Sequence, residues 1–228
     1  MNDAYEVSVT ALRTFALCAH LSEPALRTIA QRASRRLMAR NDIVVRTGEP
    51  VDSVYLVLSG TLKARVGDGP GRELILSMLG PGEVFGEMSV LDDKPCAATV
   101  LCVNPGTLVV VRKNDFMRCL REHFVVTQHL MARLVHRLRH ANRRIESLAL
   151  MDVYGRVARL LLDMAQTIDG QPTIKGRISR QDMARMVGAS REMVSRVMSE
   201  LRLNGLIEEK HGRIVLQEAP AHRTGTLR

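Results

Sequence analysis

The sequence predicts an α+β fold with an N-terminal antiparallel β-roll, a long dimerisation helix and a C-terminal winged helix-turn-helix. Three observations support this prediction. Short β-branched runs separated by glycine or proline turns fill residues 41–112, a heptad repeat of apolar residues follows, and two capped helices flank Gly188.

The composition narrows the class of protein. Of the 228 residues, 33 are Lys or Arg and 24 are Asp or Glu, and the resulting net charge of +9 favours a polyanionic partner. No apolar run approaches the roughly 18–20 residues that a membrane helix needs, and the acidic residues 1–6 lack the basic region of a signal peptide. We therefore expect a cytoplasmic protein without a membrane partner.

The β-roll is expected to follow a helical lead-in, because residues 8–38 have a helical apolar period. Its predicted strands are residues 43–45, 54–58, 61–66, 74–79, 100–103 and 108–111. Turns are expected at Ser59-Gly60 and Asn104-Pro105-Gly106, among other places. Many short strands at near-regular spacing favour a closed antiparallel roll.

One long helix is expected from about Asn114 to Leu148. From Phe124 onward, apolar residues recur at alternating spacings of three and four, with Thr127 off the pattern. A narrow stripe in so long a helix typically meets its own copy. The predicted dimer seam consists of Met131, Leu134, Leu138, Ala141, Ile145 and Leu148. The alternative is that this stripe packs on the roll of its own chain.

Residues 178–205 have the pattern of a helix-turn-helix. Ser179, with Asp182 three residues later, forms a capping-box start; Gly188 ends the first helix, Ser190 caps the second and Gly205 ends it. The next segment, residues 206–216, reads as strand, turn and strand, which is the expected wing.

The second helix of this motif is expected to read DNA. At about 100° per residue, one face is apolar and the opposite face carries polar side chains near the helix start. Side chains of these types contact base edges in a major groove. The predicted base contacts are Arg191, Glu192, Ser195 and Arg196. The alternative is a solvated amphipathic helix.

These patterns divide the chain into four parts: a sensor domain (residues 1–113), a dimerisation helix (114–150), a winged helix-turn-helix (151–218) and a flexible tail (219–228). Between residues 170 and 216, nine basic residues stand against five acidic ones, which suits contacts with DNA phosphates.

The order of roll, helix and winged helix resembles the CRP/FNR superfamily of bacterial transcription regulators, in the branch of the cyclic AMP receptor. The matching motifs are Phe85-Gly86-Glu87-Met88-Ser89, the hinge at residues 148–157, and Ser190-Arg191-Glu192 followed by Arg196. The resemblance implies a homodimer with a roll of the cyclic-nucleotide-binding type. It also implies double-stranded DNA with TGTGA-like half-sites and RNA polymerase as partners.

The resemblance assigns roles to individual residues of the DNA-binding part. It implies that Arg191 and Arg196 read guanines and that Glu192 reads a cytosine. Arg180 and Ser190 would contact DNA phosphates.

The effector site departs from the family pattern. Where relatives carry an arginine and a hydroxyl for the cyclic phosphate, this sequence has Cys96 and Ala97. The pair that contacts adenine falls at Ala141 and Asn142. A buried phosphate without its guanidinium loses on the order of 2–5 kcal/mol. We therefore expect no tight binding of cyclic AMP.

Gly86 and Glu87 persist in the effector region, where they serve either as a ribose contact or as a corner of the roll. Relatives without the arginine include some that respond to cyclic di-GMP, so this dinucleotide is a candidate effector alongside another ligand or none. Arg65, Arg72, Lys94 and the helix arginines could serve it.

Other classes of function find no support in the sequence. No catalytic motif is present, so we expect no enzyme and no catalytic residue. His136 and His140 have a spacing that can hold a metal, but no third ligand is apparent, so we expect no metal site. The second hypothesis is a dimeric small-molecule sensor that acts through a protein partner and whose own DNA binding is vestigial. The polar face formed by Arg191, Glu192 and Arg196 argues against it.

Overall fold

The computed structural model describes residues 7–67, 73–174, 178–210 and 212–217. The chain forms two compact units, Met1–Arg139 and His140–Arg228. The tail predicted over residues 219–228 lies outside the described residues.

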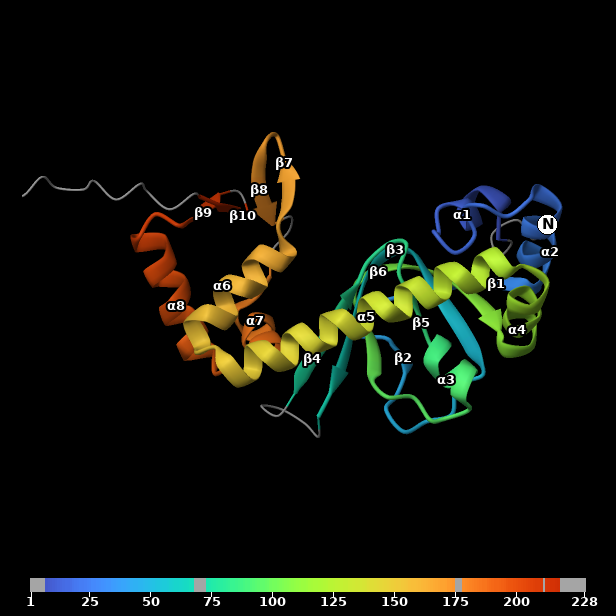
Figure 1. The fold of residues 1–228 in the computed structure, drawn as a ribbon, viewed down its shortest axis with the longest axis horizontal. Helices are drawn as coiled ribbons and strands as arrows, with labels where there is room; N and C mark the ends of the chain where they lie inside the picture. Colours follow the sequence, from blue (N-terminus) through green and yellow to red (C-terminus); the bar gives the residue numbers. More distant parts are fainter. Residues whose placement is uncertain (1–6, 68–72, 175–177, 211, 218–228) are drawn as a thin grey trace, which may run out of the picture. The chain divides into compact units, whose positions relative to one another are not determined.

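The first unit is the expected antiparallel β-roll (Figure 1). The sheet order is β1-β6-β3-β4, with β2 paired to β6 and β5 paired to β3. The strands are β1 (Ala33–Met38), β2 (Ile43–Val45), β3 (Ser53–Val66), β4 (Leu74–Leu79), β5 (Val84–Phe85) and β6 (Thr99–Arg112). The helices are α1 (Val9–Arg13), α2 (Glu23–Arg32), α3 (Glu87–Asp92), α4 (Lys113–Glu122) and the first part of α5 (Phe124–Leu150).

The central strands of the roll are buried on both faces. Along β3, Val54 and Leu56 belong to the core shared with the helices, whereas Tyr55 and Val57 belong to a second core inside the roll. Alternate residues of a strand point to opposite faces. Two buried faces therefore explain why the sequence shows continuous apolar runs here instead of an alternation.

Two expected turns lie inside long strands. Ser59-Gly60 is part of β3 and Asn104-Pro105-Gly106 is part of β6, and the pairing of these strands shifts register between Val57 and Leu62. A Cβ atom on Gly106 would lie 2.0 Å from the Ser59 carbonyl oxygen. These glycines therefore permit a close approach of two backbones at a bulge, where we had expected chain reversal.

The helical lead-in ends earlier than expected. Helix α2 stops at Arg32, and Ala33 to Met38 form β1, which pairs antiparallel with β6. The expected helix over residues 33–38 is wrong because the free edge of β6 supplies backbone hydrogen bonds that override the helical period of the side chains.

The expected single helix from Asn114 is two helices, α4 and α5, separated at His123. His123 has φ −129° and ψ 87°, which is not helical. The Thr127 hydroxyl donates a hydrogen bond of 2.8 Å to the Leu120 carbonyl near the end of α4. Thr127, the member off the apolar pattern, therefore stabilises the break.

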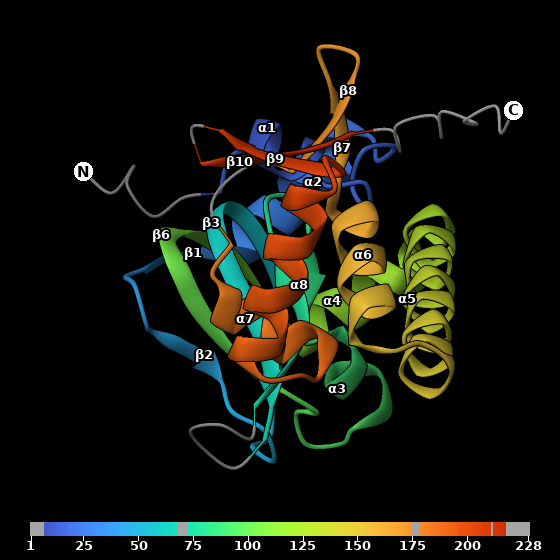
Figure 2. The same ribbon diagram turned by 90° about the vertical axis from the view of Figure 1, so that its left-hand side faces the viewer.

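The second unit is a winged helix-turn-helix (Figure 2). Helices α6 (Val153–Met164), α7 (Arg180–Val187) and α8 (Arg191–Leu203) share one core. A four-stranded antiparallel sheet accompanies them, in the order β7-β8-β10-β9. Its strands are β7 (Gln166–Ile168), β8 (Gln171–Ile174), β9 (Ile207–Lys210) and β10 (Arg213–Leu216). The wing is the predicted hairpin of β9 and β10.

Strands β7 and β8 form a second hairpin, which was not among the predicted elements. Asp169 and Gly170 both have positive φ, 51° and 78°, and connect the two strands directly. Asp-Gly is a favoured two-residue hairpin turn, so the sequence contained a signal for this hairpin. The short flanking strands, with polar residues at most positions, obscured it.

Candidate DNA-recognition helix and effector region

Helix α8 is the candidate DNA reader, and its start is fixed by a side-chain cap. The Ser190 backbone is extended, and its hydroxyl accepts a hydrogen bond of 3.2 Å from the Met193 N–H. Gly188 ends α7 with φ 65°, a conformation that glycine adopts without steric cost. Three residues of turn therefore lead directly into Arg191 and Glu192.

The predicted division of α8 into two faces is largely present. Arg191, Glu192 and Arg196 are exposed and Ser195 is half-buried. The apolar face is buried in the core of the unit through Val194, Val197, Met198 and Leu201. Met193 does not share this burial, because 45% of its surface is exposed. The helix thus presents two guanidinium groups and one carboxylate near its N-terminus.

Glu192 is held as an acceptor at the start of α8. Hydrogen bonds from its own backbone N–H and from the Ser190 hydroxyl lower the pKa of its carboxyl group, and the charge of Arg191 contributes further. The position at a helix N-terminus also favours a negative charge. An ionised carboxylate can accept a hydrogen bond from a cytosine amino group.

Arg180, the predicted phosphate contact, has a partner within the protein. Its guanidinium forms an ion pair with Glu209 of β9, and both side chains are partly exposed. A phosphate contact from Arg180 would therefore compete with Glu209. Ser190, the other predicted phosphate contact, already uses its hydroxyl to cap α8.

The effector region centres on Glu87, the first residue of α3. Its side chain is 3% exposed and forms an ion pair with Arg137 of α5. Arg137 also donates a hydrogen bond to the Val84 carbonyl. A second pair lies beside it, because Arg133 donates to Glu83 at 2.8 Å. Two arginines one turn apart on α5 therefore hold the corner of the roll.

Sequence reasoning named the helix arginines only collectively and missed this pairing. The sequence contains one indication of the pairing: Glu83 and Glu87 are four residues apart, and so are Arg133 and Arg137. The spacing alone could not show that these glutamates face α5, because they belong to a turn and to a different helix.

Glu87 keeps one free acceptor. Burial raises the pKa of its carboxyl group, and the charge of Arg137 opposes this rise. The Oε2 atom is buried and, among the described residues, has no hydrogen-bond partner. A ligand hydroxyl could satisfy this atom, which is consistent with a ribose contact.

The backbone conformation at Gly86 explains why this position holds a glycine. Its φ is 85°, and a Cβ atom here would lie 2.8 Å from the Ser53 carbonyl oxygen. The backbone at the corner of the roll therefore requires glycine whether or not a ligand binds.

The other residues predicted to bind the effector provide no positive charge for a phosphate. Cys96 is buried, and its thiol donates to the Ala98 carbonyl at 3.1 Å, while Ala97 is exposed. A neutral thiol engaged in this way does not replace a guanidinium. Ala141 and Asn142 are exposed on α5 and belong to the second unit, whereas Glu87 belongs to the first.

Basic side chains that could bind a dinucleotide also lie close to acidic side chains of the protein. Arg65 forms an ion pair with Glu73, and Lys94 lies 3.8 Å from a carboxylate oxygen of Asp92. Arg72 lies outside the described residues.

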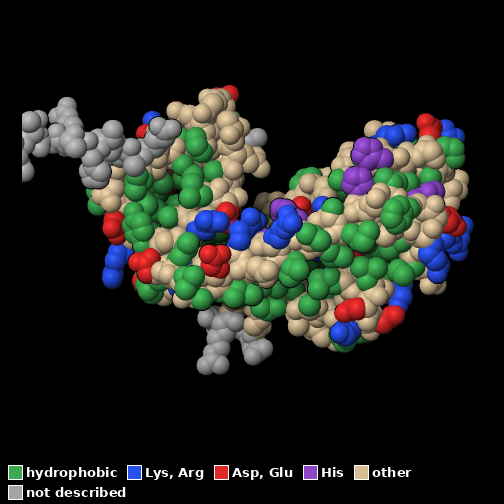
Figure 3. All heavy atoms as spheres, in the orientation of Figure 1, with side chains coloured by type: hydrophobic (Ala, Val, Ile, Leu, Met, Phe, Trp, Pro, Cys, Tyr) green, Lys and Arg blue, Asp and Glu red, His purple; other side chains and the backbone are tan. Residues whose placement is uncertain are grey.

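Most of the predicted seam is exposed on α5. Between 47% and 65% of the surface is exposed at Met131, Leu138, Ile145 and Leu148. Ala141 is exposed as well. Leu134 differs, because it packs against the core of the first unit, as the alternative interpretation had it. Figure 3 shows hydrophobic side chains along α5 with basic side chains beside them.

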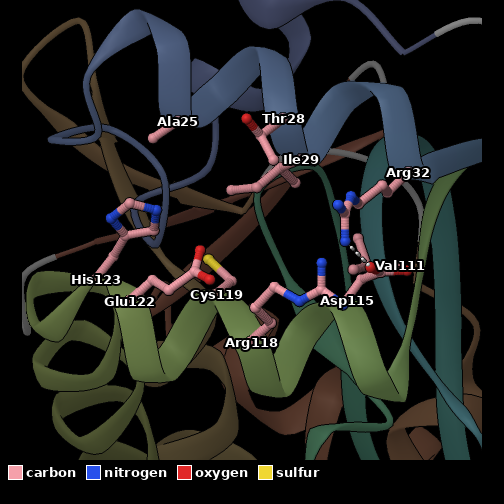
Figure 4. Close-up of a pocket in the computed structure, with 10 residues that line it drawn as sticks. All are labelled: Ala25, Thr28, Ile29, Arg32, Val111, Asp115, Arg118, Cys119, Glu122 and His123. Atoms are coloured by element: carbon pink, nitrogen blue, oxygen red, sulfur yellow. Dashed lines mark hydrogen bonds and ion pairs between the residues drawn. The ribbon is translucent and has the colours of Figure 1, made fainter.

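A pocket between α2 and α4 lies outside this candidate effector region (Figure 4). An ion pair of 2.9 Å between Arg32 and Asp115 lies at one end. The lining residues are Ala25, Thr28, Ile29, Arg32, Val111, Asp115, Arg118, Cys119, Glu122 and His123. None of them is a predicted effector contact.

Within residues 7–67, 73–174, 178–210 and 212–217, no helix is both long and apolar enough to cross a membrane. Nor do three His, Cys, Asp or Glu side chains of these residues gather where they could hold a metal ion.

Known families match both units. The family described as "Cyclic nucleotide-binding domain" matches residues 35–123, and "Crp-like helix-turn-helix domain" matches residues 155–221. The chain is 32% identical over 185 residues to the cyclic AMP receptor protein of Thermus thermophilus, a match that covers 81% of this chain and 84% of that protein. It is 29% identical over 177 residues to the cAMP-activated global transcriptional regulator CRP of Pasteurella multocida, covering 76% and 84%.

A solved structure of a transcription regulator is also similar to this chain. The c-di-GMP responsive global regulator CLP of Xanthomonas campestris superposes with a TM-score of 0.69 at 26% identity, covering 86% of this chain and 100% of that chain. Fold and sequence together define a DNA-binding transcription regulator with a cyclic nucleotide-binding domain. The chain belongs to the CRP/FNR superfamily of transcription regulators.

Proposed function

We propose that this regulator reads a TGTGA-like palindrome as a homodimer. The observation that carries the proposal is the exposed group of Arg191, Glu192 and Arg196 at the start of α8. Arginine makes two hydrogen bonds to a guanine edge and glutamate accepts from cytosine, so these residues match a G- and C-containing half-site. Arg180 and Ser190 would add phosphate contacts once DNA displaces Glu209 from Arg180.

The apolar stripe on α5 supports the homodimer. Exposed large apolar side chains recur along this helix at heptad spacing, including Met131, Leu138 and Ile145. Burying such a stripe against a second copy removes apolar surface from water and aligns two helices in parallel. Two symmetric copies would present two recognition helices to the two halves of a palindrome. On this proposal residues 1–113, 114–150 and 151–218 act as sensor, dimerisation helix and reader.

For the effector, we propose a ligand other than tightly bound cyclic AMP, with cyclic di-GMP as the first candidate. Cys96 supplies a buried thiol where a cyclic phosphate needs a guanidinium, which supports weak cyclic AMP binding. The relative named as c-di-GMP responsive supports the dinucleotide. The free Oε2 of Glu87 would accept from a ribose hydroxyl.

The proposal also implies the setting in which the protein acts. A promoter-binding regulator works beside the chromosome, in the cytoplasm, and RNA polymerase is its expected protein partner. Its role is to bind DNA and not to catalyse a reaction, as for the regulators that it resembles.

The test is fluorescence anisotropy on a TGTGA-N6-TCACA duplex and a scrambled duplex at one fixed salt concentration, without ligand, with cyclic AMP and with cyclic di-GMP. Tighter binding to the palindrome than to the scrambled duplex would support the recognition assignment, and equal binding would contradict it. A shift with cyclic di-GMP alone supports the effector proposal. A shift at micromolar cyclic AMP contradicts it.

A further inference from the structure

The last turns of α5 contact the helix-turn-helix within the second unit. Arg144 donates a hydrogen bond of 2.8 Å from Nη2 to the carbonyl of Met186, the penultimate residue of α7. The last four carbonyls of a helix have no donor within the helix. Arg144 thus supplies a donor at the end of α7, and its positive charge lies at the negative end of that helix.

Leu148, one turn further along α5, lies beside the turn that follows α7. Its Cδ2 atom lies 3.5 Å from the position that a Cβ atom would occupy on Gly188. The two side chains of α5 therefore lie beside two successive points of the chain, the end of α7 and the glycine of the turn.

Arg144 differs from its neighbour Arg143 in burial. Arg143 is exposed, whereas Arg144 is half-buried, and burial lowers the pKa of the Arg144 guanidinium. A partly buried charge is costly unless it is paired or hydrogen-bonded. The Met186 carbonyl contributes such a partner, so this contact is a specific one and not a solvated surface charge.

From these contacts we propose that Arg144 is a positioning residue for DNA recognition. It fixes the end of α7 and thereby the direction in which α8 leaves the turn. Only Gly188, Ala189 and Ser190 separate that end from Arg191, the first proposed base contact. The inference rests on the proposed function, because its effect is read out as specific DNA binding.

The test compares Arg144→Ala with Arg143→Ala. Each variant removes one positive charge from adjacent positions of the same helix, so binding to a scrambled duplex should fall equally in both. Binding to the TGTGA palindrome should be weaker in Arg144→Ala than in Arg143→Ala by up to about tenfold, because DNA binding must then order an end of α7 that has lost a hydrogen bond to a charged group. Arg144→Lys, which keeps a charged donor, should recover part of this loss. Equal palindrome-to-scrambled ratios in the two alanine variants would overturn the proposal.

A second measurement separates this inference from the proposed function. The Ala189 N–H donates to the Ala184 carbonyl at 3.0 Å across the turn. Its hydrogen exchange should be several-fold faster in Arg144→Ala than in Arg143→Ala, because the end of α7 opens more often. A wild-type protein without palindrome preference would contradict the proposed function, yet this exchange difference would still support the positioning contact. Identical exchange rates would overturn the positioning contact even if the wild-type protein binds its palindrome.

Discussion

Arg191 is exposed at the first position of α8, directly after the N-cap residue Ser190. We expect Arg191→Ala to weaken binding to the TGTGA palindrome by about 1–3 kcal/mol, because one bidentate contact with guanine is lost. The side chain belongs to no core cluster, so the dimer and the melting temperature should not change. Anisotropy measures the affinity, sedimentation of the same sample measures the dimer, and thermal unfolding measures the melting temperature. An unchanged preference for the palindrome would exclude α8 as the reader in the proposed register.

Cys96 and Ala97 mark the proposed loss of cyclic AMP binding. We expect the double variant Cys96→Arg, Ala97→Ser to bind cyclic AMP more tightly than the wild-type protein by about 2 kcal/mol or more, because it restores a charge-assisted pair with the phosphate. Isothermal titration with cyclic AMP measures this difference. Cys96→Ser is the control, since it alters the thiol without adding a charge. Tight binding by the wild-type protein would contradict our interpretation of Cys96.

The ion pair between Glu87 and Arg137 is expected to contribute to stability. Arg137→Gln leaves a buried carboxylate unpaired and should lower the free energy of unfolding by on the order of 2 kcal/mol, which allows for the 35% exposure of Arg137. The double variant Glu87→Gln, Arg137→Gln should lie closer to the wild type, because no unpaired charge remains. Urea unfolding of these variants and of Glu87→Gln completes the cycle. A double variant less stable than Arg137→Gln would contradict this account.

Burial of Glu87 also sets the sign of a pH effect. Its pKa is raised above the usual value of 4.5, so the folded state holds this proton more tightly than the unfolded state. The contribution of Glu87 to stability is therefore greatest at low pH and is lost as pH rises from about 4.5 through the raised pKa. This dependence should be absent from Glu87→Gln.

Strands β3 and β6 depend on the close approach of Gly60 and Gly106. Gly106→Ala should destabilise the roll by about 3 kcal/mol, because its Cβ atom would lie 2.0 Å from the Ser59 carbonyl oxygen. Gly80→Ala is the matched control, since nothing lies within 4 Å of its Cβ position. It should change stability by no more than about 0.5 kcal/mol. Thermal unfolding compares the two variants, and equal stabilities would show that the bulge relaxes.

Elements with strong local signals were predictable from the sequence. The caps Ser179 and Ser190 and the glycine at 188 lie in the structure where the pattern placed them, because capping depends on neighbouring residues alone. Elements decided by distant partners were not. Residues 33–38 pair with residues 106–111 of β6, far away in the sequence. The break at His123 depends on a hydrogen bond from the Thr127 hydroxyl to the Leu120 carbonyl, which no local pattern marks. The contacts of Glu87 with Arg137 likewise join residues fifty positions apart.

For the whole molecule, the proposed function requires a symmetry that one chain does not contain. The exposed residues of the α5 stripe provide a surface for a second copy, and each copy would contribute one α8 to the DNA. The excess of basic residues supports phosphate contacts but carries no sequence information. In the proposed function, specificity comes from two recognition helices that read two half-sites at a fixed spacing.

The spacing of the half-sites therefore tests recognition by a symmetric dimer. Affinity would be measured for TGTGA-N6-TCACA, for the same half-sites with an N11 spacer, and for a single half-site, all at one salt concentration. Five extra base pairs rotate the second half-site by about half a helical turn. We predict that binding to the N11 duplex falls to the level of the single half-site. Equal affinity for the N6 and N11 duplexes would contradict recognition by a symmetric dimer.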